Sequence, residues 1–330
     1  MSADPRKIVL SGMRPTGPLH LGNLVGALRN WIKLQDVYRC YYSIASWHAL
    51  SSEYMNSKVI RGYTFEVACD WLAAGLDPEK CVMFLQSEIK EHAELHLILS
   101  MVTPLPWLER VPTYKEMQQE MGDKDLNTYG FLGYPVLQAA DIVIYKADYV
   151  PVGEDQAAHL ELTREIVRRF NRIFGEIFPE PQTLLTEVPR LAGTDGRKMG
   201  KSFNNAIEIK DPPDVIRQKI MPMVTDTRRM RRSDPGEPND CPVYTLHKAF
   251  VPKEVQEEIA GGCRTAGIGC LDCKKVVIEY LLRFLAPISE RRRAFEKDPA
   301  RVWAILEDGN VRARKAARRT MDEVRAALGF

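Results

Sequence analysis

Two glycine-rich segments of this 330-residue chain contain residue types that could bind a phosphorylated ligand. The first, residues 11–23, reads Ser-Gly-Met-Arg-Pro-Thr-Gly-Pro-Leu-His-Leu-Gly-Asn and lies between an apolar run and a helical pattern. Its glycines allow close approach of the backbone, and the N-terminus of the following helix presents free N–H groups to an anion. Arg14, His20 and Asn23 add polar side chains there. A glycine-rich turn without a ligand is the alternative, because the Walker A and GxGxxG patterns are both absent.

The second segment, residues 193–202, holds Lys198 and Lys201 in a turn-prone sequence. Two ammonium groups in a mobile loop could stabilise the charge that develops on a pyrophosphate leaving group. The alternative is a solvated linker that carries two lysines.

An apolar segment, residues 133–145, contains a carboxylate that needs a partner. At helical spacing Tyr134, Gln138, Asp141 and Tyr145 fall on one stripe. Burial of a lone carboxylate is costly, so Asp141 must be paired or hydrogen-bonded. The residues leave two hypotheses open: a structural aspartate bound by the backbone or a tyrosine, and a carboxylate that recognises a ligand.

Four of the seven cysteines follow a C-x21-C-x6-C-x2-C spacing at Cys241, Cys263, Cys270 and Cys273. Such a group in a reducing compartment predicts a four-cysteine metal site, and zinc and iron–sulfur clusters both accept four thiolates. Four free buried thiols are the remaining alternative. The other cysteines lie in apolar contexts and are expected in the core.

Alternating elements position these candidates. Strands are predicted at residues 8–10, 41–45 and 82–85, and amphipathic helices from about residue 23, at 57–74 and at 91–101. This alternation predicts an α/β fold with a parallel sheet, whose ligands bind at the carboxyl ends of the strands. After Ser202 most segments are predicted to be helical.

The length predicts two domains, and 45% hydrophobic and 27% charged residues are ordinary for a soluble enzyme. The net charge of +2 neither requires nor excludes a nucleic-acid partner. Neither a signal peptide nor a membrane-spanning stretch is recognised, so a cytoplasmic location is expected.

Three motifs resemble those of a known family. Gly-Pro-Leu-His-Leu-Gly-Asn23 resembles the HIGH signature of class I aminoacyl-tRNA synthetases, and Lys198-Met-Gly-Lys-Ser202 resembles their KMSKS loop, with Gly200 in place of a serine. Residues 134–142, 150–156 and 159–164 are similar to tryptophanyl-tRNA synthetases. The loss of a hydroxyl at Gly200 predicts a looser loop that costs more entropy to close.

The resemblance implies an enzyme that converts L-tryptophan and ATP to tryptophanyl-adenylate and pyrophosphate, with Mg²⁺ on the phosphates, and then charges tRNA(Trp). It implies a Rossmann-like catalytic domain at residues 1–202, with a dimer-forming insertion at about 104–145, working as a homodimer. A helical anticodon-binding domain would span residues 203–330, and its last helix would pack back on the catalytic domain.

The resemblance also implies site residues. Catalytic roles would fall to His20, Asn23, Lys198, Lys201 and Ser202. The ATP-binding set would be Arg14, Pro15, Thr16, Gly22, Asn23, Gly153, Glu154, Asp155, Leu191, Lys198, Met199, Gly200, Lys201 and Ser202. Asp141 would accept the indole N–H of tryptophan, in a pocket completed by His48, Tyr134, Val150, Val152 and Gln156.

The cysteine pattern is similar to that of bacterial members that carry a [4Fe-4S] cluster in the anticodon-binding region, which favours iron–sulfur over zinc. Basic runs at residues 228–232, 291–293 and 312–319 suggest a surface that binds the tRNA backbone.

Three rival functions remain open. A tyrosyl-tRNA synthetase shares both signatures, and a nucleotidyltransferase of the same superfamily shares the first. Gly200 gives some weight to a non-catalytic iron–sulfur RNA-binding protein derived from a synthetase.

Overall fold

The computed structural model describes residues 5–110, 128–153, 157–185 and 191–330, apart from the side chains of Leu185 and Ser202. None of the helices in these ranges is long and apolar enough to cross a membrane.

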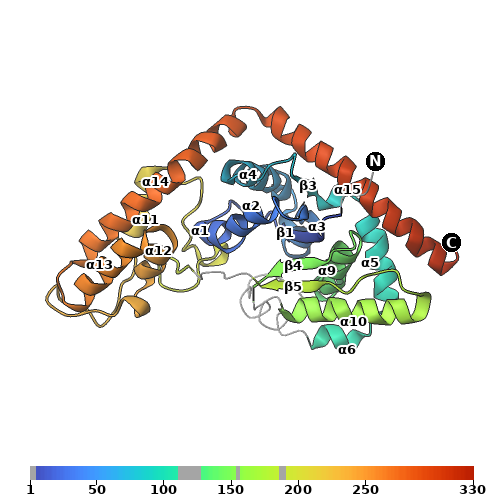
Figure 1. Ribbon diagram of the computed structural model, residues 1–330, viewed down its shortest axis with the longest axis horizontal. Helices are drawn as coiled ribbons and strands as arrows, with labels where there is room; N and C mark the ends of the chain where they lie inside the picture. Colours follow the sequence, from blue (N-terminus) through green and yellow to red (C-terminus); the bar gives the residue numbers. More distant parts are fainter. Residues whose placement is uncertain (1–4, 111–127, 154–156, 186–190) are drawn as a thin grey trace.

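A five-stranded parallel sheet forms the centre of the molecule (Figure 1). Its strands are β1 (Ile8–Met13), β2 (Arg39–Ile44), β3 (Cys81–Leu85), β4 (Tyr149–Val152) and β5 (Gln182–Leu185), in the order β3-β2-β1-β4-β5. The chain runs outward from β1 in both directions, and ligands of such sheets bind at the carboxyl ends beside this reversal. The predicted α/β class and the three predicted strands are confirmed, and β4 and β5 are additions.

Helices cover both faces of the sheet. Those of the first half are α1 (Leu21–Asn23), α2 (Arg29–Leu34), α3 (Ser46–Glu53), α4 (Val59–Ala74), α5 (Glu91–Val102), α6 (Leu105–Glu109), α8 (Tyr129–Leu132), α9 (Tyr134–Val143) and α10 (Ala157–Phe174). The helix predicted from about residue 23 begins at Leu21 and contains a π-helical turn, η1 (Leu24–Leu28), before α2. Short 3₁₀ turns are η2 (Tyr54–Asn56), η3 (Gln86–Glu88), η5 (Lys201–Phe203) and η6 (Pro238–Asp240).

The second half is helical in its described residues, with α11 (Pro213–Ile220), α12 (Pro242–Phe250), α13 (Lys253–Arg264), α14 (Cys270–Glu296) and α15 (Pro299–Leu328). Helices α14 and α15 form the two long arms in Figure 1, and α15 lies along β3, α4 and α5. A Cβ atom on Gly309 of α15 would lie 1.7 Å from the carbonyl oxygen of Met83, so only glycine allows this approach.

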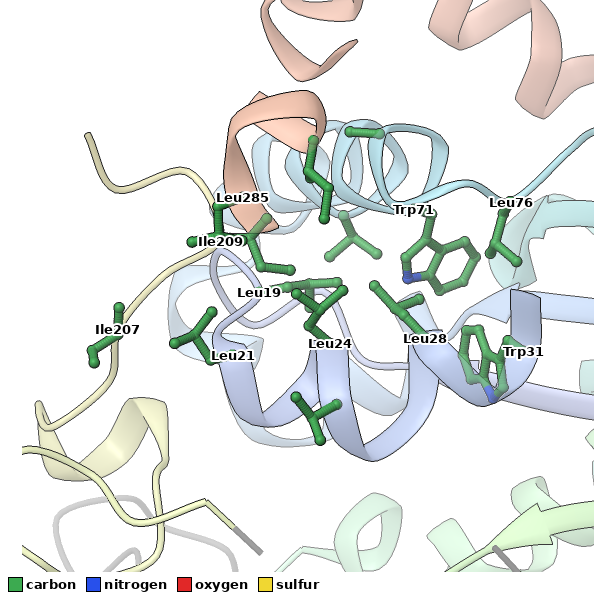
Figure 2. Packing of buried hydrophobic residues seen from close by; sticks show 14 of the residues in the cluster. Leu19, Leu21, Leu24, Leu28, Trp31, Trp71, Leu76, Ile207, Ile209 and Leu285 are labelled. Atoms are coloured by element: carbon green, nitrogen blue, oxygen red, sulfur yellow. The ribbon is translucent and has the colours of Figure 1, made fainter. Parts of the chain in front are cut away.

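Successive side chains of each strand point to opposite faces of the sheet and belong to two different apolar clusters. Val9, Tyr42 and Ile44 belong to the first cluster, whereas Leu10 and Tyr41 belong to the second. Figure 2 shows that the first cluster joins Leu19 and Trp31 of the first loop and helix to Ile207, Ile209 and Leu285 of the second half. A single apolar cluster thus contains residues from before and after residue 202. The domain boundary at this residue stays a prediction.

A buried ion pair connects α14 to the first glycine-rich segment. Arg292 donates through Nε to Oδ1 of Asp70 on α4 at 2.7 Å, and Asp70 is fully buried. The other oxygen of Asp70 accepts from the backbone N–H of Leu19 at 3.1 Å. Arg292 also donates to Glu66 at 2.5 Å. One carboxylate therefore ties the second half of the chain to the loop that precedes α1.

We expect Arg292→Leu to lower the free energy of unfolding by about 3–5 kcal/mol, because Asp70 is then left as an uncompensated buried charge. Urea denaturation followed by circular dichroism measures this. Arg283→Leu on the same helix removes an exposed pair with Glu279 and serves as the control, with little expected change. Equal midpoints for the two variants would contradict the proposed importance of the buried pair.

Candidate active site

A cavity of about 500 Å³ lies at the carboxyl ends of β1, β2 and β4. Predicted residues that line it together are Arg14, Asn23, His48, Tyr134, Asp141, Val150, Val152 and Gly153. Gln138 of the predicted stripe lines it as well. Glu154, Asp155 and Gln156 lie outside the described residues. The described side chains assigned to tryptophan, and part of the ATP set, therefore line the same cavity.

His20 caps the first helix. Its Nδ1 accepts from the backbone N–H of Asn23 at 3.3 Å, and its own backbone N–H donates to Oδ1 of Asn23 at 3.1 Å. Burial, with the charges of Lys201 and Lys198, lowers the pKa of His20 to about 4. The imidazole is therefore neutral at pH 7, and because Nδ1 accepts, the proton sits on Nε2. The His-x-x-Asn spacing is a reciprocal cap that leaves one ring N–H for other partners.

The two glycine-rich segments meet, although about 180 residues separate them. Leu21 donates its backbone N–H to the carbonyl of Ile207 at 2.9 Å, and Ile209 donates to the carbonyl of Leu19 at 2.9 Å. Between these bonds His20 and Glu208 form an antiparallel bridge. The chain that follows the lysine loop is thus paired along the start of α1.

Lys201 reaches from the second segment to the first. Its Nζ donates to the carbonyl oxygen of Gly17 at 2.6 Å. Gly17 has φ +137°, a conformation that favours glycine, and a Cβ there would lie 3.3 Å from the lysine stem. Burial, with the nearby charge of Arg14, lowers the pKa of Lys201 to about 8, and Asp70 and Glu208 oppose this shift. Part of the Lys201 population is therefore neutral in mildly alkaline solution.

Asn205, which was not predicted from the sequence, holds the lysine loop (residues 193–202) through three hydrogen bonds. Its Oδ1 accepts from the backbone N–H of Gly200 at 2.9 Å, and its Nδ2 donates to the carbonyl of Lys198 at 3.1 Å and to Asp195 at 2.7 Å. Met199 is buried and donates its N–H to the carbonyl of Leu191, which is also buried. The only sequence feature that could have indicated this role is the position of an asparagine three residues after the motif.

The glycine of the lysine loop is not required by backbone conformation. Gly200 has φ −163°, which any residue adopts. A Cβ at this position would lie 3.2 Å from the ring of Phe203, so a side chain requires a small movement of that ring. The other described residues of the ATP set do not line the cavity, and neither does His20; they are Pro15, Thr16, Gly22, Leu191, Lys198, Met199, Gly200 and Lys201.

Asp141 is buried at the cavity wall and already has partners. Its Oδ2 accepts from Nε2 of His48 at 2.8 Å, and its Oδ1 accepts from Nδ1 of His92 at 2.6 Å. The amide of Gln86 donates to both oxygens at 2.9 and 2.8 Å. Burial acts to raise the pKa of Asp141, but the hydrogen bonds from His48 and His92 outweigh it and hold the pKa well below its ordinary value. The carboxylate is thus ionised and satisfied by side chains, rather than by the backbone or a tyrosine.

Gln86 and His92 were not predicted from the sequence. Gln86 follows directly after β3, as His48 follows shortly after β2, so the rule that polar residues gather at the carboxyl ends of strands could have found it. His92 is the second residue of α5 and fully buried, and nothing in the local pattern of that helix marks it. Tyr134, by contrast, is held by His159, because its hydroxyl lies 2.8 Å from Nε2 of that ring.

The four spaced cysteines come together in the second half of the chain. Cys241 precedes α12, Cys263 lies on α13, and Cys270 and Cys273 lie on the first turn of α14. Burial, followed by the charges of the other three thiols, raises the pKa of Cys273 to about 12. All seven cysteines are free. In the part of the chain that the structure describes, however, no three His, Cys, Asp or Glu residues are arranged to hold a metal ion.

Several arginines of the basic runs bind the protein itself. Arg228 pairs with Asp226 and Asp240, and Arg229 donates to the carbonyl of Ile268 at 2.6 Å. On α15, Arg312 donates to the carbonyl of Pro78 at 2.7 Å, and Arg314 donates to that of Glu88 at 2.8 Å. The carboxylates beside Arg228 offset its charge, whereas bonds to carbonyl oxygens restrain Arg229 and Arg314 without removing theirs.

Comparison with known proteins gives a consistent result. A family model described as tRNA synthetases class I (W and Y) matches residues 3–286. The tryptophan–tRNA ligase of Thermotoga maritima is 53% identical over 324 residues, which cover 98% of this chain and 99% of that protein. The tryptophan–tRNA ligase of Deinococcus radiodurans is 44% identical, with 98% of both proteins covered.

Solved structures agree with the relatives. The tryptophanyl-tRNA synthetase of Campylobacter jejuni, in a complex with ADP and tryptophan, is 32% identical and has a TM-score of 0.87. The match covers 98% of this chain and 100% of that one. A tyrosyl-tRNA synthetase of Archaeoglobus fulgidus, 23% identical with a TM-score of 0.65 over 88% of this chain and 91% of that one, shares the fold.

The parallel sheet, the meeting of the two signature loops and these similarities define one class of enzyme. The chain belongs to the class I tRNA synthetases of the tryptophan and tyrosine branch. Within that family its function is tryptophan–tRNA ligation, an enzymatic activity that consumes ATP. The predicted enzyme class and function are confirmed.

The position of Lys201 predicts a pH dependence. We expect kcat/KM for ATP to fall above about pH 8, because the ammonium that faces the first loop loses its proton there. In Lys201→Arg this alkaline fall should move beyond the measurable range, since a guanidinium stays protonated. Tryptophan-dependent ATP–pyrophosphate exchange across pH 6–10 measures it. Lys210→Arg, at an exposed pair with Glu66, is the control, and the same alkaline limb in both variants would contradict the assignment.

Proposed function

We propose that the cavity binds L-tryptophan beside Asp141 and ATP beside the two signature loops, so that the tryptophan carboxylate attacks the α-phosphorus. The bond from the α-phosphorus to the bridging oxygen breaks, and pyrophosphate leaves. A Mg²⁺ ion on the phosphates would offset the negative charge of this leaving group. The terminal ribose hydroxyl of tRNA(Trp) then attacks the tryptophanyl carbonyl, and AMP leaves. No side-chain nucleophile is needed, so the protein contributes orientation and electrostatic stabilisation.

On the ATP side, the junction of the two loops supports the assignment. Neutral His20 has an Nε2–H that can donate to a phosphate oxygen, and Lys201 lies across from it at Gly17. Lys198 and Ser202 flank Lys201 and would act with it on the leaving pyrophosphate. The remaining ATP contacts of this proposal are Arg14, Pro15, Thr16, Gly22, Asn23, Gly153, Glu154, Asp155, Leu191, Met199 and Gly200.

On the tryptophan side, the ionised carboxylate of Asp141 carries the proposal. An indole N–H that donates to a buried carboxylate forms a charge-assisted bond. His48, Tyr134, Val150 and Val152 line the same cavity and would enclose the ring, with Gln156 on the tryptophan side. A site built for such a donor discriminates strongly against side chains that lack one.

We expect Asp141→Asn and Asp141→Ala to raise the tryptophan KM in ATP–pyrophosphate exchange by roughly 10- to 100-fold, because a charge-assisted hydrogen bond is lost. The KM for ATP should change little. Asp36→Ala, which removes an exposed carboxylate paired with Lys80, is the control. An unchanged tryptophan KM and kcat in both Asp141 variants would refute the role of this residue.

We further propose that Cys241, Cys263, Cys270 and Cys273 hold a [4Fe-4S] cluster. The four free thiols act on one another electrostatically, yet no three of them, with the other described ligand types, are arranged around a single ion. A four-iron cluster takes one thiolate per iron, so its ligands need not converge on one point. Arg229 Nη1 lies 3.9 Å from the sulfur of Cys263, and such a donor suits a thiolate bound to metal. Bound there, the cluster would cross-link α12, α13 and α14 and take no part in adenylate formation.

Anaerobically purified protein should be brown and should contain iron and sulfide in equal amounts. Cys270→Ser with Cys273→Ser should lose both, because two of the four thiolates are removed. Cys69→Ala removes a buried cysteine of α4 and should keep both. A colourless protein with one zinc per chain would overturn the iron–sulfur assignment in favour of zinc.

We also propose a cytoplasmic homodimer that binds tRNA(Trp). Large apolar side chains are exposed on α5, at Leu97 and Met101, and within the predicted insertion at 104–145, at Leu105 and Tyr129. Exposed apolar patches of this kind are typical of interfaces between subunits. Residues 111–127 of the predicted insertion lie outside the described part of the chain.

A further inference from the structure

The donors around Asp141 fall into two groups. A carboxylate has about four acceptor positions, and the bonds from His48, His92 and the two from Gln86 account for that number. Gln86 and His92 are fully buried and do not line the cavity, whereas His48 does. A ligand in the cavity can therefore replace the bond from His48 without disturbing the other donors.

Hydrogen bonding fixes the ring of His92 at both nitrogens. The ionised carboxylate can only accept, so Nδ1 of His92 carries a proton and donates to Asp141. The other nitrogen of the ring, Nε2, lies 2.7 Å from the hydroxyl of Tyr145. Burial raises the pKa of Tyr145 well above its ordinary value, which keeps this hydroxyl protonated as a donor. Tyr145, His92 and Asp141 thus form a continuous chain of hydrogen bonds.

Packing holds the far end of this chain in place. The ring of Tyr145 stacks on Tyr41 of β2 with centroids 4.6 Å apart and meets Phe84 of β3 edge-on at 5.3 Å. Gln86 is fixed in a similar way, because its Oε1 accepts from the backbone N–H of Trp47 at 3.0 Å. This bond orients the amide so that its NH₂ group faces Asp141. The carboxylate is therefore supported from the sheet and from the start of α3.

We propose that His92, supported by Tyr145, is a positioning and specificity-determining residue that holds Asp141 so that its Oδ2 can exchange the bond from His48 for one from the indole N–H. The proposal rests on the role of Asp141 as the acceptor for tryptophan. A side chain without an N–H that displaces His48 leaves Oδ2 without that donor, and rejection follows. If His92 did not hold the carboxylate, Asp141 could turn toward other donors and the penalty would shrink.

The test compares L-tryptophan with 3-(benzothiophen-3-yl)-L-alanine, in which sulfur replaces the indole N–H at nearly the same size. The readout is the ratio of the two kcat/KM values in ATP–pyrophosphate exchange. We expect the unmodified enzyme to favour tryptophan by roughly 10- to 100-fold. His92→Leu should reduce this ratio about tenfold or more, with little change in the KM for ATP.

Three further variants separate positioning from mere packing. His92→Asn places an amide N–H near the position of Nδ1 and should keep most of the preference. Tyr145→Phe removes only the hydroxyl, should fold even where His92→Leu does not, and should reduce the preference measurably. Ser100→Ala removes an exposed hydroxyl of α5 that donates to the carbonyl of Leu97, and should leave the ratio unchanged.

Two outcomes would overturn the inference: an equal loss of kcat/KM for both amino acids in His92→Leu, or an unchanged ratio in Tyr145→Phe. Failure of the underlying function has a different signature. If the unmodified enzyme shows no preference for tryptophan over the sulfur analogue, Asp141 does not recognise the indole N–H, whatever the variants do.

Discussion

The pairing of residues 19–21 with residues 207–209 is the constraint on which the active site depends. Two backbone hydrogen bonds, at 2.9 Å each, align chain segments that are far apart in sequence. The same segments bury Leu19, Leu21, Ile207 and Ile209 in one apolar cluster, so the hydrogen bonds are shielded from water (Figure 2). Without this pairing the lysine loop would have no fixed position relative to the helix N-terminus. The reach of Lys201 to Gly17 is a consequence of that alignment.

Much of the architecture follows from local patterns in the sequence. Strands β1, β2 and β3 are recognisable as short apolar runs before turn residues, and their alternation with helices predicts a parallel sheet. Strand β4 is less visible, because Tyr149–Val152 contains a proline and only four residues. The π-helical turn after α1 was not predicted, because a single turn of five residues is too short to establish a periodicity of its own.

The candidate site was predicted in part, for a physical reason. Arg14, His48, Asp141 and Val150 lie in or beside recognisable motifs, and the structure brings them to one cavity. Gln86, His92 and Asn205 act through hydrogen bonds to residues distant in sequence, and a single polar residue in an apolar stretch does not reveal its partner. The arginines of the basic runs show the converse. Their clustering suggests a nucleic acid, yet Arg292, Arg312 and Arg314 bind carboxylates or carbonyls of the same chain.

Helix α14 connects two distant parts of the molecule. Its 27 residues correspond to a length of about 40 Å. Cys270 and Cys273 lie at its first turn, and Arg292 lies near its end. Arg292 donates to Asp70, and the same carboxylate accepts from the backbone N–H of Leu19. Pro287 lies inside the helix between these two ends, and a proline there removes one backbone hydrogen bond and favours a kink. The loop that precedes α1 is therefore connected to the cysteine-bearing end of the molecule through one helix, and the proline of that helix lies between the two contacts.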